Sequence, residues 1–70
     1  MKKIPQFDDT VIINKAIKYT LFGSEYETYA GQKAIVNDDY DEENDELYVA
    51  LLDHDGDVIT YISISLDDIY

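Results

Sequence analysis

The 70-residue chain has no cysteine, one proline and three glycines. Without cysteine, neither a disulfide nor a thiolate metal site can stabilise the fold. A chain of this length predicts one domain over residues 1–70 with a thin core, because small domains bury only about 60% of their unfolded surface. Packing alone must stabilise that core, and 46% of the residues are hydrophobic.

Long hydrophobic runs are also lacking. No apolar segment approaches the roughly 20 residues that are needed to span a bilayer. The N-terminal segment Met1–Gln6 contains Pro5 and is not followed by the apolar segment of a secretory signal. Anionic lipids would repel an acidic chain. We therefore expect a cytoplasmic protein that does not contact membranes.

Positive charge is scarce and confined to the first half of the chain. All five lysines lie within residues 1–33, where four acids leave a net charge of +1. Residues 34–70 contain the other twelve acids and neither lysine nor arginine, so their net charge is −12. This asymmetry predicts an interaction face of one sign. Direct binding to DNA or RNA is disfavoured, because it requires a basic surface.

The C-terminal part of the chain predicts a β-hairpin. The apolar run Leu47–Leu52 is followed by Asp53–Asp57, whose aspartates and glycine favour a tight turn. Residues 58–66 then alternate with period two, which places Val58, Thr60, Ile62, Ile64 and Leu66 on one face. Residues 31–36 predict a third strand, and residues 66–69 a short closing turn. The three strands form an antiparallel meander.

Residues 9–22 fit two structures. Their apolar residues recur at helical spacing, with Gly23 as a helix end and a cap available at the start (Asp8, Asp9 or Thr10). The β-branched run Thr10–Ile13 instead favours a strand, followed by a loop or a short helix. We favour the strand and keep the helix as the alternative.

This order of strands and turns resembles the small SH3-like barrels. The pattern comprises a first strand after Phe7, a long loop, the strand at 31–36, a variable turn, and the hairpin with its closing turn. The resemblance implies a mainly β fold, which is a small SH3-like antiparallel barrel or meander, with one short helix as an option in residues 10–22. A resemblance in fold assigns no function by itself.

Residues 38–46 hold seven carboxylates in nine positions. Such a run can be a solvated, mobile hairpin tip, but further acids follow it and their self-repulsion destabilises a thin core. We therefore favour a functional acidic surface, with Tyr40 as an apolar anchor for a partner. The candidate partner-binding residues are Asp38, Asp39, Tyr40, Asp41, Glu42, Glu43, Asp45, Glu46, Asp53, Asp55, Asp57, Asp67 and Asp68.

A small, cysteine-free, tyrosine-rich and strongly acidic domain resembles the phage-encoded DNA mimics that disable host proteins. That class includes inhibitors of the nucleoid protein HU, of uracil-DNA glycosylase, of restriction enzymes and of CRISPR nucleases. The resemblance rests on size, charge and the 38–46 run, and no motif matches residue by residue. It implies a protein of the host cytoplasm that blocks the DNA-binding surface of a basic protein. HU is the favoured partner, because its concave DNA-binding saddle is rich in lysine and arginine.

Two other kinds of binding module remain open. An SH3-like adaptor or accessory module of a phage would bind a protein through an aromatic groove, with Tyr26, Tyr29 and Tyr61 as its contacts. A cation-dependent module would use the acidic surface. An exposed edge strand could also support a homodimer, although nothing in the sequence specifies one.

Residues 53–57 do not match a calcium motif. An EF-hand loop counted from Asp53 needs glycine at its sixth position and glutamate at its twelfth, where this chain has Val58 and Ile64. We expect neither a metal nor a cofactor. His54 has no identifiable nucleophile or metal partner, and the three isolated glycines form no phosphate-binding loop. We therefore expect no enzymatic activity.

Overall fold

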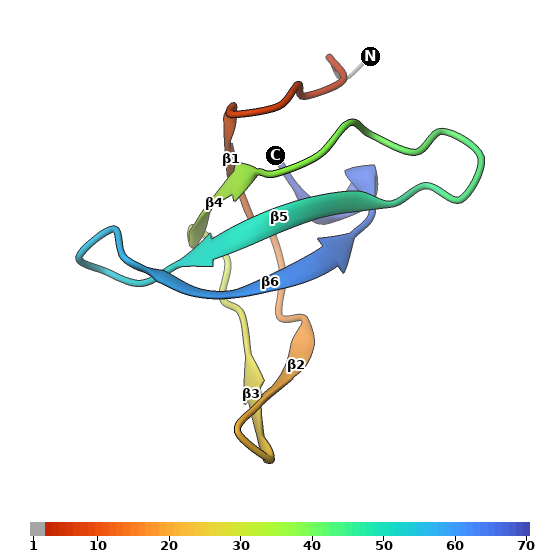
Figure 1. The fold of residues 1–70 in the computed structure, drawn as a ribbon. Coiled ribbons are helices and arrows are strands. Elements are labelled where there is room, and N and C mark those ends of the chain that lie inside the picture. Colours follow the sequence, from red (N-terminus) through yellow and green to blue (C-terminus); the bar gives the residue numbers. More distant parts are fainter. Residues whose placement is uncertain (1–2) are drawn as a thin grey trace.

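A computed structural model describes residues 3–70 and shows a mainly β protein, as predicted (Figure 1). Four strands form an antiparallel sheet in the order β1–β4–β5–β6, and two more form a separate hairpin, β2–β3. One 3₁₀ helix, η1, follows β6. The bounds are β1 Thr10–Ile12, β2 Lys18–Leu21, β3 Ser24–Glu27, β4 Lys33–Val36, β5 Leu47–Leu52, β6 Val58–Ile64 and η1 Leu66–Asp68.

The core lies on one face of the four-stranded sheet, because alternate residues of each strand point to that face. Its largest fully buried side chains are Ile13, Val36, Leu47, Val49 and Leu51. The predicted meander is present as β4–β5–β6. Burial of this apolar set stabilises the domain, which has no cysteine and therefore no disulfide.

Residues 10–22 contain two strands, β1 and β2, and no helix, so the favoured strand at the start of this range is right and the alternative helix is wrong. Thr10, Val11 and Ile12 pair with β4, which satisfies their backbone groups and suits their β-branched side chains. A loop follows them at residues 14–17, as expected, and the chain then enters the β2–β3 hairpin, which was not expected. Gly23 ends no helix, because it and Phe22 form the turn of this hairpin with φ of 79° and 51°.

The β2–β3 hairpin projects away from the sheet (Figure 1) and is fastened at its base by Thr28. The buried Thr28 hydroxyl accepts a hydrogen bond from the Ile17 amide and donates one to the Lys15 carbonyl, both at 2.8 Å. The Thr28 amide donates to the Ile17 carbonyl at 2.9 Å. These bonds fix the hairpin at its base and leave its tip in solvent.

The chain end returns to β1. After η1, Ile69 forms an antiparallel bridge with Ile13. The Tyr70 amide donates to the Ile12 carbonyl at 3.0 Å, and the Asn14 amide donates to the Asp68 carbonyl at 2.8 Å. One side of β1 is thus paired with β4, and the other is bridged to the C-terminal residues.

The predicted face of β6 is wrong at its first residue. Val58 is 48% exposed, whereas Ile59 packs against the core. Leu51 pairs with Thr60 and Leu52 pairs with Val58, so Ile59 is an extra residue in the ladder. Such a β-bulge reverses the alternation of side chains beyond it.

Candidate protein-interaction surface

Residues 38–46, the acidic loop, connect β4 to β5 and are internally ordered. Asp41 and Glu46 form an antiparallel bridge through two backbone hydrogen bonds of 2.9 and 3.2 Å. The Asp41 carboxylate accepts hydrogen bonds from the Asn44 side chain at 2.9 Å and the Glu43 amide at 3.0 Å. These bonds, with the Asn44 side chain first, lower the pKa of Asp41. The loop therefore carries hydrogen bonds of its own along its length.

Asp45 anchors the acidic loop to the chain that follows β6. Its carboxylate accepts hydrogen bonds from the Ser65 hydroxyl, from the Tyr40 hydroxyl at 2.6 Å and from the Leu66 amide at 3.2 Å. The Ser65 bond is the largest cause of a lowered pKa at Asp45. In return, the bond to the Asp45 carboxylate raises the pKa of Tyr40 to about 12.

Tyr40 is partly buried, and its ring packs against the core of its own domain. From the sequence, this ring was a candidate apolar anchor for a partner. Because the ring packs against the core and the hydroxyl binds Asp45, Tyr40 mainly holds the acidic loop in place.

The two aspartates of η1 differ in their surroundings. Asp68 accepts a hydrogen bond from the Ser65 amide at 2.9 Å and forms an ion pair with Lys15, with 3.2 Å between Nζ and Oδ1. Asp67 is exposed. Of these two predicted site residues, Asp67 presents its charge to solvent and Asp68 is used within the fold.

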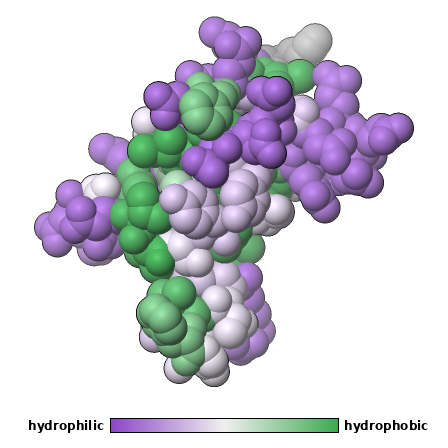
Figure 2. Space-filling model, in the orientation of Figure 1, coloured by the Kyte–Doolittle hydropathy of each residue, from purple (hydrophilic) through white to green (hydrophobic). Residues whose placement is uncertain are grey.

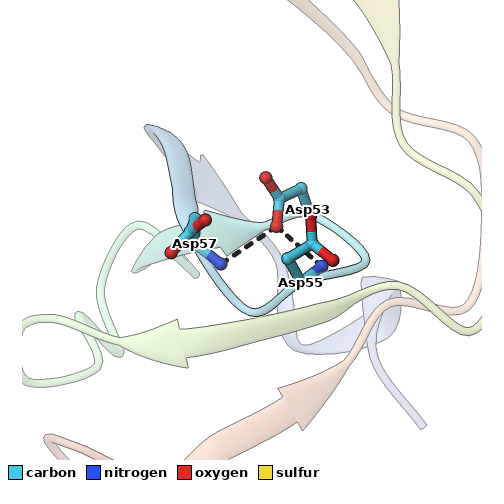
Figure 3. A group of neighbouring side chains, drawn as sticks. All are labelled: Asp53, Asp55 and Asp57. Atoms are coloured by element: carbon cyan, nitrogen blue, oxygen red, sulfur yellow. Dashed lines mark hydrogen bonds between the residues drawn. The ribbon is translucent and has the colours of Figure 1, made fainter.

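Asp53, Asp55 and Asp57 lie in the turn between β5 and β6, the aspartate turn (residues 53–57; Figure 3). One oxygen of Asp53 accepts hydrogen bonds from the amides of Asp55 and Asp57, each at 2.9 Å. The three carboxylates are exposed, and their closest oxygens lie within 4.8 Å of one another. The Asp53 bonds stabilise the turn, in which Gly56 has a φ of 85°.

The structure divides the predicted acidic face into two acidic ends. The acidic loop and the aspartate turn lie at opposite ends of β5 (Figure 1). Six residues of strand separate them, which corresponds to about 20 Å. Asp67 belongs with the acidic loop, because the Asp45 carboxylate bonds the start of η1.

Between the acidic ends lies the outer sheet face, the face opposite the core, which was not predicted as a site. Tyr48 and Tyr61 stack on this face with ring centroids 5.8 Å apart and an interplanar angle of 13°. They are 41% and 48% exposed. The available signal was Tyr48, the one polar side chain in the apolar run of β5, because it must face away from the neighbouring residues Leu47 and Val49.

The tyrosines of the alternative aromatic groove fall into three separate stacked pairs. Tyr26 stacks on Tyr19 within the hairpin, and Tyr29 stacks on His54 beside the aspartate turn. Tyr61 instead stacks on Tyr48. The structure therefore distributes these three rings over the hairpin, the aspartate turn and the outer sheet face.

The fold and its surface define a small acidic β domain with aromatic side chains between two acidic ends. No family model, curated protein or solved structure matches the chain. Within residues 3–70, no helix has the length and apolar character that crossing a membrane requires.

Proposed function

We propose that this protein binds a basic DNA-binding protein and blocks its access to DNA, with the nucleoid protein HU as the favoured partner. The main support for this proposal is the pair of acidic ends, which belong to a half-chain of net charge −12. Carboxylates about 20 Å apart can pair with separate basic side chains of a DNA-binding surface, which meets closely spaced phosphate charges along a duplex.

The proposed mechanism is occlusion and involves no chemical step. Carboxylates at both ends attract lysine and arginine side chains that otherwise contact phosphates, and such complementarity speeds association at low salt. The protein would act in the cytoplasm of a bacterial host and would be phage-encoded, in keeping with the DNA mimics that it resembles. It would need neither a metal nor a cofactor.

Competition for labelled duplex DNA tests this function. Purified HU is bound to the duplex at low salt, and this protein is titrated into the complex. We expect release of the DNA, and an excess that leaves the DNA bound would exclude HU as the target. Parallel titrations with other basic DNA-binding proteins would then show whether any DNA-binding surface is recognised.

A matched pair of double variants tests the role of the acidic loop. Glu42 and Glu43 are exposed, and their side chains are not used in the hydrogen bonds that hold the loop. Replacing both by glutamine should weaken displacement about tenfold at low salt, since each lost charge pair contributes on the order of 1 kcal/mol or less. The same change at Glu25 and Glu27, which are exposed on β3, should leave displacement nearly unchanged. Equal losses in both variants would indicate a nonspecific effect of net charge.

A further inference from the structure

The outer sheet face carries apolar and aromatic side chains between the acidic ends. Ile35, Ala50 and Tyr61 are aligned across β4, β5 and β6, and Tyr48 pairs with Ser63 in the neighbouring row. Ala50 is buried in this row, whereas Tyr48 and Tyr61 are exposed. Val58 lies further toward the aspartate turn. Figure 2 shows hydrophilic surface toward both ends of the sheet, with paler and hydrophobic surface between them.

The exposed rings of this face are not needed to build the core, which lies on the opposite face. Contiguous apolar surface with a polar rim marks interaction sites on small proteins. Tyrosine is also enriched among the residues that dominate binding energy. Stacking of Tyr48 on Tyr61 restricts both rings before any partner arrives, which lowers the entropy cost of binding.

We propose that the outer sheet face is the docking surface for the basic partner, with Tyr48 and Tyr61 in direct contact and the two acidic ends flanking them. This inference rests on the proposed function and adds the contact surface to it. The surface fits an arginine-rich partner, because guanidinium groups stack on tyrosine rings and also pair with carboxylates.

Charge argues against a second copy of this chain as the occupant. In a face-to-face two-fold dimer with aligned strands, whether parallel or antiparallel, each acidic end would meet an acidic end of the other copy. Each copy carries a net charge of −11, and juxtaposed like charges oppose association. A basic surface instead meets complementary charge at both ends.

A matched pair of single variants tests the inference in the displacement assay with HU. Tyr61 and Tyr26 are 48% and 47% exposed, lie in strands, and stack on another tyrosine with centroids 5.8 Å apart. Y61T should weaken displacement by about tenfold or more, as expected for a central aromatic contact. Y26T, on the projecting hairpin, should match the wild type. Threonine keeps a high strand propensity at both positions.

Binding kinetics separate the two kinds of contact. Loss of Tyr61 should mainly raise the dissociation rate, whereas loss of Glu42 and Glu43 should mainly lower the association rate and its dependence on salt. The inference is overturned if Y61T displaces DNA as well as wild type while the glutamate variant does not. A loss confined to Y26T would overturn it as well, by placing the contact on the hairpin. Failure of the wild type to displace DNA would instead count against the proposed function itself.

Two measurements on the wild type keep the inference testable if Y61T is unstable. Amide NMR shifts on adding HU should change along β5 and β6 and at the acidic ends, and changes confined to β2 and β3 would overturn the inference. Sedimentation of the protein alone should show a monomer. A dimer that Y61T converts to monomer would overturn the inference by placing a second copy on this face.

Discussion

At the scale of single residues, the carboxylates of the acidic loop divide by what they contact. Asp41 and Asp45 accept hydrogen bonds that shape the loop and hold it near η1. Glu42 and Glu43 point their charge to solvent. Both kinds contribute to the same negative field, but only replacement of the second kind removes charge without loosening the loop.

The hydrogen bond between Tyr40 and Asp45 predicts a late tyrosine titration. The neutral phenol is favoured beside the carboxylate, which raises the pKa of Tyr40 to about 12 from an ordinary value of 10.0. Because the folded-state pKa is raised, this bond stabilises the fold fully below about pH 10 and is lost as the pH rises through about 12. An ultraviolet titration of phenolate should show a step near pH 12 that Y40F removes and Y26F leaves. Persistence of the step in Y40F would contradict the assignment.

At the scale of elements, the β2–β3 hairpin carries an unfavourable turn residue at its tip. Phe22 is 97% exposed and has a φ of 51°, a left-handed conformation that disfavours bulky side chains. Asparagine followed by glycine is the preferred pair for a two-residue turn with both φ values positive. F22N should therefore raise stability by roughly 0.5–1 kcal/mol, seen as a melting temperature a few degrees higher.

The control for this prediction is F22A, which removes the same exposed ring but keeps a residue that disfavours positive φ. Its melting temperature should stay close to that of the wild type. A lower melting temperature for F22N would show that the Phe22 ring packs favourably in the folded protein.

The same hairpin shows where the sequence did not suffice to predict the strands. Apolar runs or alternation next to clear turn residues predict strands at residues 31–36, 47–52 and 58–66. The hairpin has no such pattern, since β3 is exposed at all four positions and Phe22 is an unusual turn residue. Ile13 and Ile17 gave a helical spacing although Ile13 bridges Ile69 and Ile17 precedes β2.

The candidate site was predictable in composition but not in arrangement. The acidic residues and the tight turn at 53–57 follow directly from the sequence. Their separation depends on the length of β5, and the stacking of Tyr48 on Tyr61 depends on the register of β5 with β6. That register includes the bulge at Ile59, which no residue type in the local sequence indicates. The outer sheet face therefore required the structure.

At the scale of the whole molecule, the net charge of −11 destabilises the folded state by self-repulsion. The same folded state holds the two acidic ends at a fixed separation. The ends are about 20 Å apart. The Debye length is about 30 Å at 0.01 M salt and about 10 Å at 0.1 M, so repulsion between the ends acts mainly at low salt. Within each end, carboxylates lie much closer together and repel one another over a wider range of salt.

Salt should therefore shift stability and binding in opposite directions. Raising sodium chloride from 0.01 to 0.2 M should raise the melting temperature, because screening relieves self-repulsion, while displacement of DNA from HU should weaken at matched occupancy of the duplex. The variant with glutamine at positions 42 and 43 should show a smaller rise, since it carries two fewer charges. A melting temperature that fell with salt would mean that attractive pairs such as Lys15–Asp68 outweigh the repulsion among the acids. The acidic surface would then lower the free energy of unfolding only slightly, and self-repulsion would no longer indicate that the surface is kept for a function.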